Sequence, residues 1–483
     1  MHFTAGATRG VRLALALGAL TLWGCGRTAR DVGDGPVEVP GSGGAGGAPL
    51  AGAAGEGALP SPLPIDCTTL TAVEFEDADL ELVVRQLIEV PAGRISVAAL
   101  QRLTDLWAPA PYEGHEITSL RGLECANEVT RVMLNGARIA DLSPLSGLQN
   151  LERLSLQGWG VRDLSPLAGL RRLKELELAD NPITSLEPLS AVTSLVSLRA
   201  WGTELASLAG IEHLQQLESL AVMTSQVSDI SPVQGLQALT ELSLSRNRIS
   251  DLGPLANLQA LEVLRIDGND VRDLSPLSTL PRLTLVDLTL NRVTSLAPLS
   301  GLPELETLSA SDNQILTLAD LQALPSLQSL SVSRNPLGSL AGVEALPSLV
   351  RLDAADTGLR DLVGLESLAQ LASLYVGDNA ISDLSPLGSA IQLVSLDLHS
   401  NQLVELEPLR GLTGPQFLDF SDNQVSDLGP ISGLRCSGLC CGLLLVGNPL
   451  DQASREQLVP QLCDAHMSVT WTGGSCDSCI NPP

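Results

Sequence analysis

The segment Leu239–Ala260, LTELSLSRNRISDLGPLANLQA, decides the fold because the chain repeats it. Copies follow one another on a 22-residue period without insertion or deletion, and fourteen of them begin at positions 129, 151, 173, 195, 217, 239, 261, 283, 305, 327, 349, 371, 393 and 415. A fixed period of this length is typical of a solenoid, in which each unit buries its apolar face only against its neighbours. We therefore expect one elongated repeat domain.

Each repeat carries the pattern of a short strand followed by a turn. Positions 4 and 6, such as Leu242 and Leu244, alternate with polar residues, as in a half-buried strand. Position 16 is proline in ten of the fourteen copies, and proline suits the first residue of a short helical turn. The pattern predicts parallel strands on a concave face and 3₁₀ or short helical turns on a convex face.

Position 9 is usually asparagine. An inward asparagine offers two donors and an acceptor, so stacked copies can satisfy the backbone where the strand turns away. The register slips by three residues after Arg435, which adds one more member at position 448. Trp159 takes the same position in its repeat, and the pattern leaves its direction open. The predicted ladder is Asn181, Asn247, Asn269, Asn291, Asn313, Asn335, Asn379, Asn401, Asn423 and Asn448.

The DLSPL segments at 141–145, 163–167, 273–277 and 383–387 resemble the 22-residue subclass of leucine-rich repeats. That subclass is found in bacterial internalins and in a eukaryotic regulatory subunit of protein phosphatase 1. The resemblance covers residues 75 to 471. It implies an α/β, right-handed leucine-rich repeat solenoid of a family that binds proteins and shares no catalytic residue.

Both ends of such a repeat array need a cap, because a terminal repeat would otherwise expose a slab of leucines. Residues 67–128 are predicted to form a helical N-terminal cap from two amphipathic runs, FEDADLELVVRQLIEVP and ISVAALQRLTDLW. Asp77 or Asp79 can cap the first helix and Ser96 the second. Apolar residues at helical spacing in the first run are Leu80, Val83, Val84, Leu87 and Ile88. The repeats then occupy residues 129–450, and residues 451–483 form a C-terminal cap with a closing helix, a last strand and a tail.

The N-terminus has the features of an export signal. Arg9 and Arg12 precede an apolar run, and the run ends in Leu22-Trp23-Gly24-Cys25, which resembles a bacterial lipoprotein signal, although Trp23 departs from its pattern. Residues 1–24 are thus predicted to be the signal peptide. Residues 25–66 would be the lipidated Cys25 and a flexible Gly/Ala/Pro tether. The alternative is an ordinary secretory signal with an incidental cysteine. The lipid would hold the chain in the bacterial envelope, at the outer membrane or cell surface rather than the inner membrane.

The remaining eight cysteines all flank the regular repeats, at Cys67, Cys125, Cys436, Cys440, Cys441, Cys463, Cys476 and Cys479. Outside the cytoplasm this placement predicts disulfide-stapled caps, with Cys67 joined to Cys125. The six C-terminal cysteines allow fifteen pairings, which the sequence does not resolve. The rival interpretation is a zinc site that uses the Cys476-x-x-Cys479 pair.

Composition and motifs exclude several classes of function. The 28 basic and 55 acidic residues argue against nucleic acid or an anionic membrane surface as a partner. No GxSxG, P-loop or HExxH motif occurs, and the five histidines share no metal-ligand spacing. We therefore predict a monomeric, non-enzymatic chain without a metal or cofactor, attached to the membrane only through its lipid.

Positions 3, 5, 7 and 8 of each repeat should point from the strands into the concavity, where a partner protein would bind. Trp201 is expected to be the main anchor, with the alternative that it only shields the sheet, and the groove charges are expected to run from basic to acidic. The candidate partner-binding residues are Arg153, Arg199, Trp201, Met223, Val263, Arg265, Leu285, Tyr375, Asp397, His399 and Phe417. The leading hypothesis is a lipid-anchored, extracytoplasmic protein-binding scaffold. The alternatives are an envelope protein that holds carbohydrate or peptidoglycan, and a regulator of an enzyme.

Overall fold

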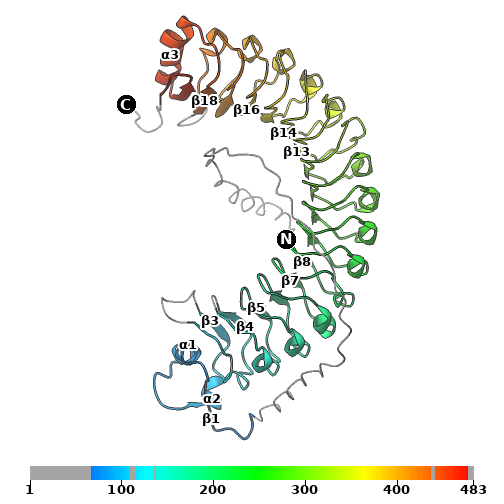
Figure 1. Cartoon of the computed structure of the whole chain (residues 1–483), viewed down its shortest axis with the longest axis vertical. Coiled ribbons are helices and arrows are strands. Elements are labelled where there is room, and N and C mark those ends of the chain that lie inside the picture. The colour runs from blue at the N-terminus through cyan, green and yellow to red at the C-terminus, as the bar shows by residue number, and fades with distance from the viewer. Residues whose placement is uncertain (1–66, 109–115, 135–136, 437–440, 477–483) are drawn as a thin grey trace, which may run out of the picture. The chain divides into compact units, whose positions relative to one another are not determined.

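One parallel sheet carries the repeats, and each repeat contributes one short strand to it. The computed structural model describes residues 67–108, 116–134, 137–436 and 441–476, which all lie within the unit Pro64–Pro483. Strands β3 to β19 pair in sequence order, all parallel, and β20 pairs antiparallel with β19. The sheet strands are β3 (Asp105–Ala108), β4 (Arg131–Leu134), β5 (Arg153–Ser155), β6 (Glu175–Glu177), β7 (Ser197–Arg199), β8 (Ser219–Ala221), β9 (Glu241–Ser243), β10 (Val263–Arg265), β11 (Leu285–Asp287), β12 (Thr307–Ser309), β13 (Ser329–Ser331), β14 (Arg351–Asp353), β15 (Ser373–Tyr375), β16 (Ser395–Asp397), β17 (Phe417–Asp419), β18 (Cys441–Leu445), β19 (Met467–Trp471) and β20 (Gly474–Cys476). In this unit they line the inner side of an arc, as predicted (Figure 1).

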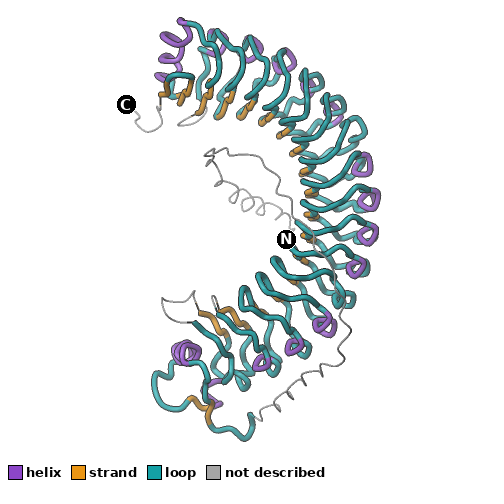
Figure 2. Tube along the Cα trace, in the orientation of Figure 1, coloured by secondary structure: helices purple, strands orange, loops and turns teal. Residues whose placement is uncertain are grey.

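The outer side of the same arc is made of short helical turns (Figure 2). The described residues contain twelve 3₁₀ helices, at Ser143–Leu145, Ser165–Leu167, Glu187–Ala191, Ser231–Val233, Gly253–Leu255, Ser275–Thr279, Ala297–Leu299, Val343–Ala345, Leu365–Ser367, Ser385–Leu387, Glu407–Leu409 and Gly429–Ile431. In the proline-containing turns an acidic or hydroxyl side chain often caps the first residue. Asp273, for example, accepts the backbone N–H of Ser275 at 2.8 Å. Proline at the next position then has no N–H that needs a partner.

Three of the repeats that lack this proline use a glycine–glutamate turn instead. Gly210, Gly342 and Gly364 stand at position 16 with φ between 104° and 106°, a region that suits glycine alone. In each case the glutamate two residues later accepts the glycine N–H at 2.8 Å. A Cβ on Gly342 would lie 2.5 Å from the backbone of Leu318 in the preceding repeat, so this turn also needs glycine for space.

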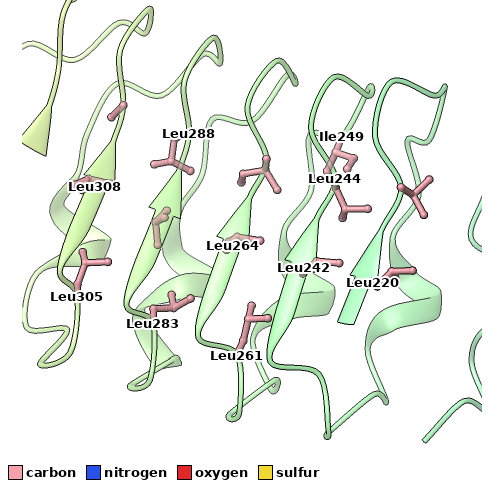
Figure 3. Packing of buried hydrophobic residues seen from close by; sticks show 14 of the residues in the cluster. Leu220, Leu242, Leu244, Ile249, Leu261, Leu264, Leu283, Leu288, Leu305 and Leu308 are labelled. Atoms are coloured by element: carbon pink, nitrogen blue, oxygen red, sulfur yellow. The ribbon is translucent and has the colours of Figure 1, made fainter. Parts of the chain in front are cut away.

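The core of the repeats is a leucine column made of several parallel rows of buried apolar side chains, most of them leucines (Figure 3). Leu220, Leu242 and Leu264 occupy the same position of three successive repeats and are each at most 1% exposed. Adjacent repeats keep this registry because their strands pair at equivalent positions, as Leu242 does with Leu264. Each repeat thus buries its apolar residues against the repeats before and after it.

The asparagine ladder forms hydrogen bonds of the kind the sequence predicts. In all ten members the side-chain Nδ2 donates to a backbone carbonyl of the preceding repeat, at 2.7–3.0 Å. In all ten, Oδ1 accepts a backbone N–H of the preceding repeat, at 2.9–3.0 Å. Each asparagine therefore fastens its own repeat to the one before it.

Trp159 takes the place of one asparagine and keeps part of its function. Its side chain points inward and is 2% exposed. The indole Nε1–H donates to the carbonyl of Leu134, 25 residues earlier, at 3.0 Å. Asn181 makes the corresponding bond to Leu156, also 25 residues earlier, at 2.7 Å. An indole has no acceptor, so Trp159 supplies the donor of the ladder but not the acceptor.

The N-terminal cap begins with helix α1 (Ala78–Ile88), which follows a short strand β1 (Ala72–Val73). Asp77 is the N-cap, and its Oδ1 accepts the N–H groups of Asp79 and Leu80. Leu80, Val84 and Ile88 are buried, as predicted. Val83 is half-buried and Leu87 is 42% exposed, so only part of the predicted apolar stripe faces the core.

The prediction of a second helix in the cap, over residues 95–107, is wrong over most of its length. Strand β2 (Ile95–Ser96) pairs with β1, and helix α2 (Val97–Leu100) spans four residues, capped by Ser96. Residues 105–108 form β3, the first strand of the main sheet, in which Leu106 and Ala108 are buried while Asp105 and Trp107 are exposed. That alternation has period two, so pairing with β4 wins over the helical pattern.

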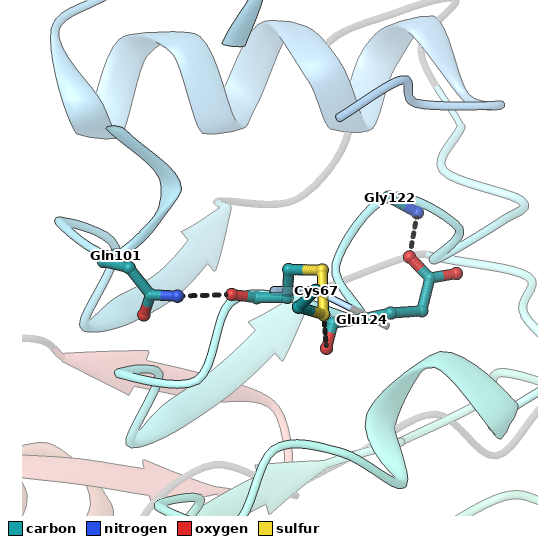
Figure 4. Close-up of a disulfide and its surroundings, with 5 residues drawn as sticks. Cys67, Gln101, Gly122 and Glu124 are labelled. Atoms are coloured by element: carbon teal, nitrogen blue, oxygen red, sulfur yellow. Dashed lines mark hydrogen bonds between the residues drawn. A yellow bond between two sulfur atoms is a disulfide. The ribbon is translucent and has the colours of Figure 1, made fainter. Parts of the chain in front are cut away.

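Three disulfides join cysteines of the described residues, at the two ends of the repeats. Cys67 is joined to Cys125, as predicted, and Gln101 donates to the carbonyl of Cys125 at 2.8 Å (Figure 4). At the other end Cys436 is joined to Cys441 and Cys463 to Cys476. Cys440 and Cys479, like Cys25, lie outside the described residues.

The C-terminal cap covers the last leucines with a helical segment and a strand. A π-helical turn (Ser454–Leu458) leads into α3 (Val459–Asp464), which is followed by β19, so the predicted closing helix and last strand are both present. Val459 and Leu462 are buried. No helix within the described ranges is long and apolar enough to cross a membrane.

Candidate functional site

The candidate partner-binding residues all lie on the concave face of the sheet or in the loop directly after a strand. Arg153 is on β5, Arg199 on β7, Val263 and Arg265 on β10, Leu285 on β11, Tyr375 on β15, Asp397 on β16 and Phe417 on β17. Trp201, Met223 and His399 follow β7, β8 and β16 by two residues. Strand pairing places equivalent positions side by side, for example Val263 beside Leu285 and Tyr375 beside Asp397. The side chains therefore form continuous rows across the strands.

The N-terminal part of this face is not basic overall, contrary to the expected charge gradient. Arg131 lies 3.7 Å from Asp105, and Arg153 lies 3.9 Å from Glu175. These arginines and Arg199 line a shallow hollow together with Met133, Glu175 and Glu177. Arg131 and Arg153 lie side by side on β4 and β5, but the strands on either side carry Asp105 and Glu175, so the surface offers paired charges rather than a positive patch.

Trp107 is the most exposed aromatic side chain on the described part of this face, and the sequence analysis missed it. It is 51% exposed on β3 and stands opposite Met133 of β4. Trp201 is only partly exposed, which fits either an anchor or a shield of the sheet. The signal that could have revealed Trp107 is the alternation Asp-Leu-Trp-Ala at 105–108, which had been assigned to a helix.

The central strands carry short hydroxyl side chains that bind to one another or to carboxylates. Ser311 and Ser331 are 2.8 Å apart, and Ser333 donates to Asp353 on β14. Next to them, the guanidinium of Arg351 lies 4.3 Å above the ring of Tyr375 and donates to its hydroxyl at 3.2 Å. This cation–π contact fixes the orientation of Tyr375.

The C-terminal third is acidic, as expected, and one histidine lies among its carboxylates. His399 Nδ1 is 2.6 Å from Asp397 Oδ1, and Nε2 is 3.1 Å from Asp378 Oδ2. Partial burial lowers the pKa of His399, but the hydrogen bonds and charges of Asp397 and Asp378 outweigh it and raise the pKa above its ordinary value. A polar atom of Asp419 on β17 lies within 4.8 Å of those of Asp397 and His399.

Comparisons with known proteins agree with this fold. A family model described as leucine-rich repeats (two copies) matches residues 149–191 and 237–279. An internalin of Listeria monocytogenes is 28% identical, with 72% of this chain and 96% of that chain covered and a TM-score of 0.59. A leucine-rich repeat protein of Leptospira interrogans is 22% identical over 77% of this chain and 97% of that chain, with a TM-score of 0.67. A search of curated proteins found no match.

A third solved structure was determined with a bound partner. It is the leucine-rich repeat ectodomain of a plant membrane receptor kinase from Arabidopsis thaliana in complex with Casparian strip integrity factor 2. It is 18% identical, covers 71% of this chain and 48% of that chain, and has a TM-score of 0.55. The chain is thus a leucine-rich repeat solenoid similar in structure to bacterial internalins.

Proposed function

We propose that this chain is a non-enzymatic scaffold that binds a partner protein through the concave face of strands β3 to β17. One observation carries the proposal: the side chains on the concave face are needed neither for packing of the core nor for the backbone hydrogen bonds between repeats. The leucine column and the asparagine ladder account for the packing and for the backbone at the strand ends, yet Trp107 is still 51% exposed toward solvent. A large aromatic side chain that the fold does not need to bury is typical of an interface anchor.

A carbohydrate or peptidoglycan ligand fits this face less well. Sugar-binding surfaces present aromatic rings in a row, whereas Trp107 on β3 and Trp201 after β7 are separated by strands β4, β5 and β6. The paired charges of Arg131 with Asp105 and of Arg153 with Glu175 suit a polar protein surface. Regulation of an enzyme would be one consequence of protein binding and would use the same face.

The experiment begins with capture of the partner by proximity crosslinking in intact cells, followed by binding measurements with the full chain. Trp201→Ala and Trp107→Ala should each weaken binding at least about tenfold through faster dissociation, because a desolvated tryptophan contributes roughly 2 kcal/mol. The matched control is Glu407→Gln on the convex side, where the carboxylate contacts Arg410 within its own turn. If both tryptophan variants bind like the wild type while convex-side changes abolish binding, the concave face is not the site.

We further propose that Cys25 anchors the chain to the bacterial envelope through a lipid. Three disulfides support an extracytoplasmic location, because such bonds persist in oxidising compartments. The Leu22–Cys25 segment and the Gly/Ala/Pro tract after it support the lipid. Replacement of Cys25 by serine should move the protein from the membrane pellet to the soluble fraction. A variant that stays in the pellet as the wild type does would contradict the anchor.

A further inference from the structure

His399 contacts a carboxylate with each of its two ring nitrogens. Nδ1 lies 2.6 Å from Asp397 of the adjoining strand β16, and Nε2 lies 3.1 Å from Asp378 in the loop after the neighbouring strand β15. An ionised carboxylate only accepts hydrogen bonds, so both nitrogens must carry a proton for both contacts to be favourable. Neutral imidazole has one N–H, and its other nitrogen would direct a lone pair at an oxygen. The geometry therefore fits the imidazolium ion.

Space for the ring is provided by Gly377 at the same position of the preceding repeat. A Cβ built on Gly377 would overlap both Cε1 and Nδ1 of His399. The backbone of Gly377 does not require glycine, since its φ is not in the left-handed region. Neighbouring repeats carry Ala355 and Ser421 at this position. The absence of a side chain on Gly377 thus lets the imidazole lie against the preceding repeat, between the two carboxylates.

The charged and titratable groups around the ring come from three adjacent strands and their loops. Asp378 follows β15, Asp397 is on β16 and Asp419 is on β17. Tyr375 of β15 is beside Asp397, and its hydroxyl is bonded to Arg351. The imidazolium therefore lies among three carboxylates, while Arg351 is bonded to Tyr375. His399 and the three carboxylates together carry a charge of −2 with the proton on His399 and −3 without it.

We propose that His399 is a proton-operated clamp that joins the repeats beginning at 371 and 393 on the concave face. With the proton bound, it holds Asp378 and Asp397 together across the strand boundary. Without the proton, one of the two contacts becomes repulsive, the clamp opens, and three uncompensated carboxylates face the groove. The direction of the His399 pKa, above its ordinary value, agrees with this arrangement.

The sign of the effect on stability follows from the raised pKa. Stabilisation by a group with a raised folded pKa is fully present below its unfolded pKa and is lost as the pH rises through the folded value. The clamp should thus stabilise the C-terminal repeats in mildly acidic solution and cease to do so in alkaline solution. If the concave face binds a partner as proposed above, the open state suits a cationic segment of that partner, and binding should strengthen as the pH rises.

The test uses the full chain without any partner, so its outcome is independent of the proposed function. Nitrogen chemical shifts of the histidine rings are recorded from pH 5 to 9 with EDTA present, and His399→Gln assigns the signal. We expect His399 to retain two ring protons at pH values at which a histidine in a short unstructured peptide is neutral. Asp378→Asn should move the His399 midpoint to lower pH. A neutral His399 with a single tautomer at pH 6 would overturn the clamp.

Thermal unfolding gives a second readout. His399→Gln and Gly377→Ala, which removes the space for the ring but leaves its charge, should both lower the unfolding temperature at pH 5.5 and should differ less from the wild type at pH 9. His213→Gln is the matched control and should follow the wild type throughout. If the difference between wild type and His399→Gln does not change between pH 5.5 and 9, the proton does not operate a clamp.

An oligo-arginine peptide tests the consequence for binding. Its affinity for the wild type should increase from pH 5.5 to 8 by more than its affinity for His399→Gln. An equal increase in affinity for both proteins would show that the proton on His399 does not control the negative charge of this face.

Discussion

Replacement of Asn291 by alanine should destabilise the protein severely, although none of its hydrogen-bond partners is a candidate binding residue. Its Nδ2 donates to the carbonyls of Ile266 and Leu288, both at 2.9 Å, and its Oδ1 accepts the N–H of Val271 at 3.0 Å. Asn291 is 8% exposed, so water has little access to these groups. Alanine would leave the N–H of Val271 and the carbonyl of Ile266, both in the preceding repeat, without this partner.

The expected magnitude follows from those two groups. A buried backbone group that loses its partner costs about 1–3 kcal/mol, so two of them give about 2–6 kcal/mol. Denaturant unfolding followed by far-UV circular dichroism measures this loss as a lower midpoint at unchanged slope. Asn291→Thr should lose less, because threonine already occupies this position at Thr203 and Thr357, where the hydroxyl donates to a carbonyl three residues earlier.

Asn257→Ala is the matched control, since Asn257 is exposed on the convex side two repeats earlier. It should change the free energy of unfolding by no more than about 0.5 kcal/mol. If Asn291→Ala and Asn257→Ala are equally stable, the ladder bonds contribute no net stability and the reasoning is refuted.

Three other changes test other parts of the fold. Gly342→Ala should destabilise the protein by more than about 2 kcal/mol, because it combines left-handed strain with a Cβ 2.5 Å from the backbone of Leu318. The control Gly338→Ala, with φ 66° and no atom within 4 Å of the new Cβ, should cost only about 1 kcal/mol. Equal losses of stability would mean that the close approach to Leu318 is unimportant. The double variant Cys67→Ser, Cys125→Ser should lower the free energy of unfolding by about 4 kcal/mol, the loop-entropy estimate for a separation of 58 residues. An unchanged free energy of unfolding would show that the cap is held by packing alone. Burial opposes ionisation of Asp77, but hydrogen bonds from Thr118, Leu80 and Asp79 outweigh it and lower the pKa of Asp77 below its usual value. The stabilisation by Asp77 is therefore present above its unfolded pKa and is lost as the pH falls through the folded pKa. Asp77→Asn should make the free energy of unfolding less dependent on pH in acid, and an unchanged dependence would contradict this role.

The 22-residue period made the strands, the core column and the ladder predictable, because each of these depends on one residue at a fixed position. Leu242 and Asn291 need no information from outside their own and adjacent repeats. The direction of Trp159 was not predictable, since only the structure shows that its indole N–H reaches the carbonyl that an asparagine would otherwise bind.

The cap and the charges of the groove were harder to predict for a different reason. Residues 105–108 become a strand because β4 is available for pairing, and a helical pattern in the isolated segment says nothing about that neighbour. The predicted basic end considered Arg153 and Arg199 without Glu175 and Glu177, which strand pairing places next to them. His399 was assigned to the groove, but its position depends on the glycine at the equivalent position of the preceding repeat.

The asparagine ladder also limits how the length of this chain can change. Nine members bond to backbone groups 25 and 20 residues earlier, whereas Asn448 bonds 28 and 23 residues back across the three-residue slip after Arg435. An extra residue within a regular repeat must therefore be accommodated in a loop between the two repeats whose ladder bonds span it. Removal or duplication of one whole repeat instead joins two equivalent positions and leaves each bond with an equivalent partner. The concave face can thus gain or lose area in whole units of one strand, while the two disulfide-bonded caps stay the same.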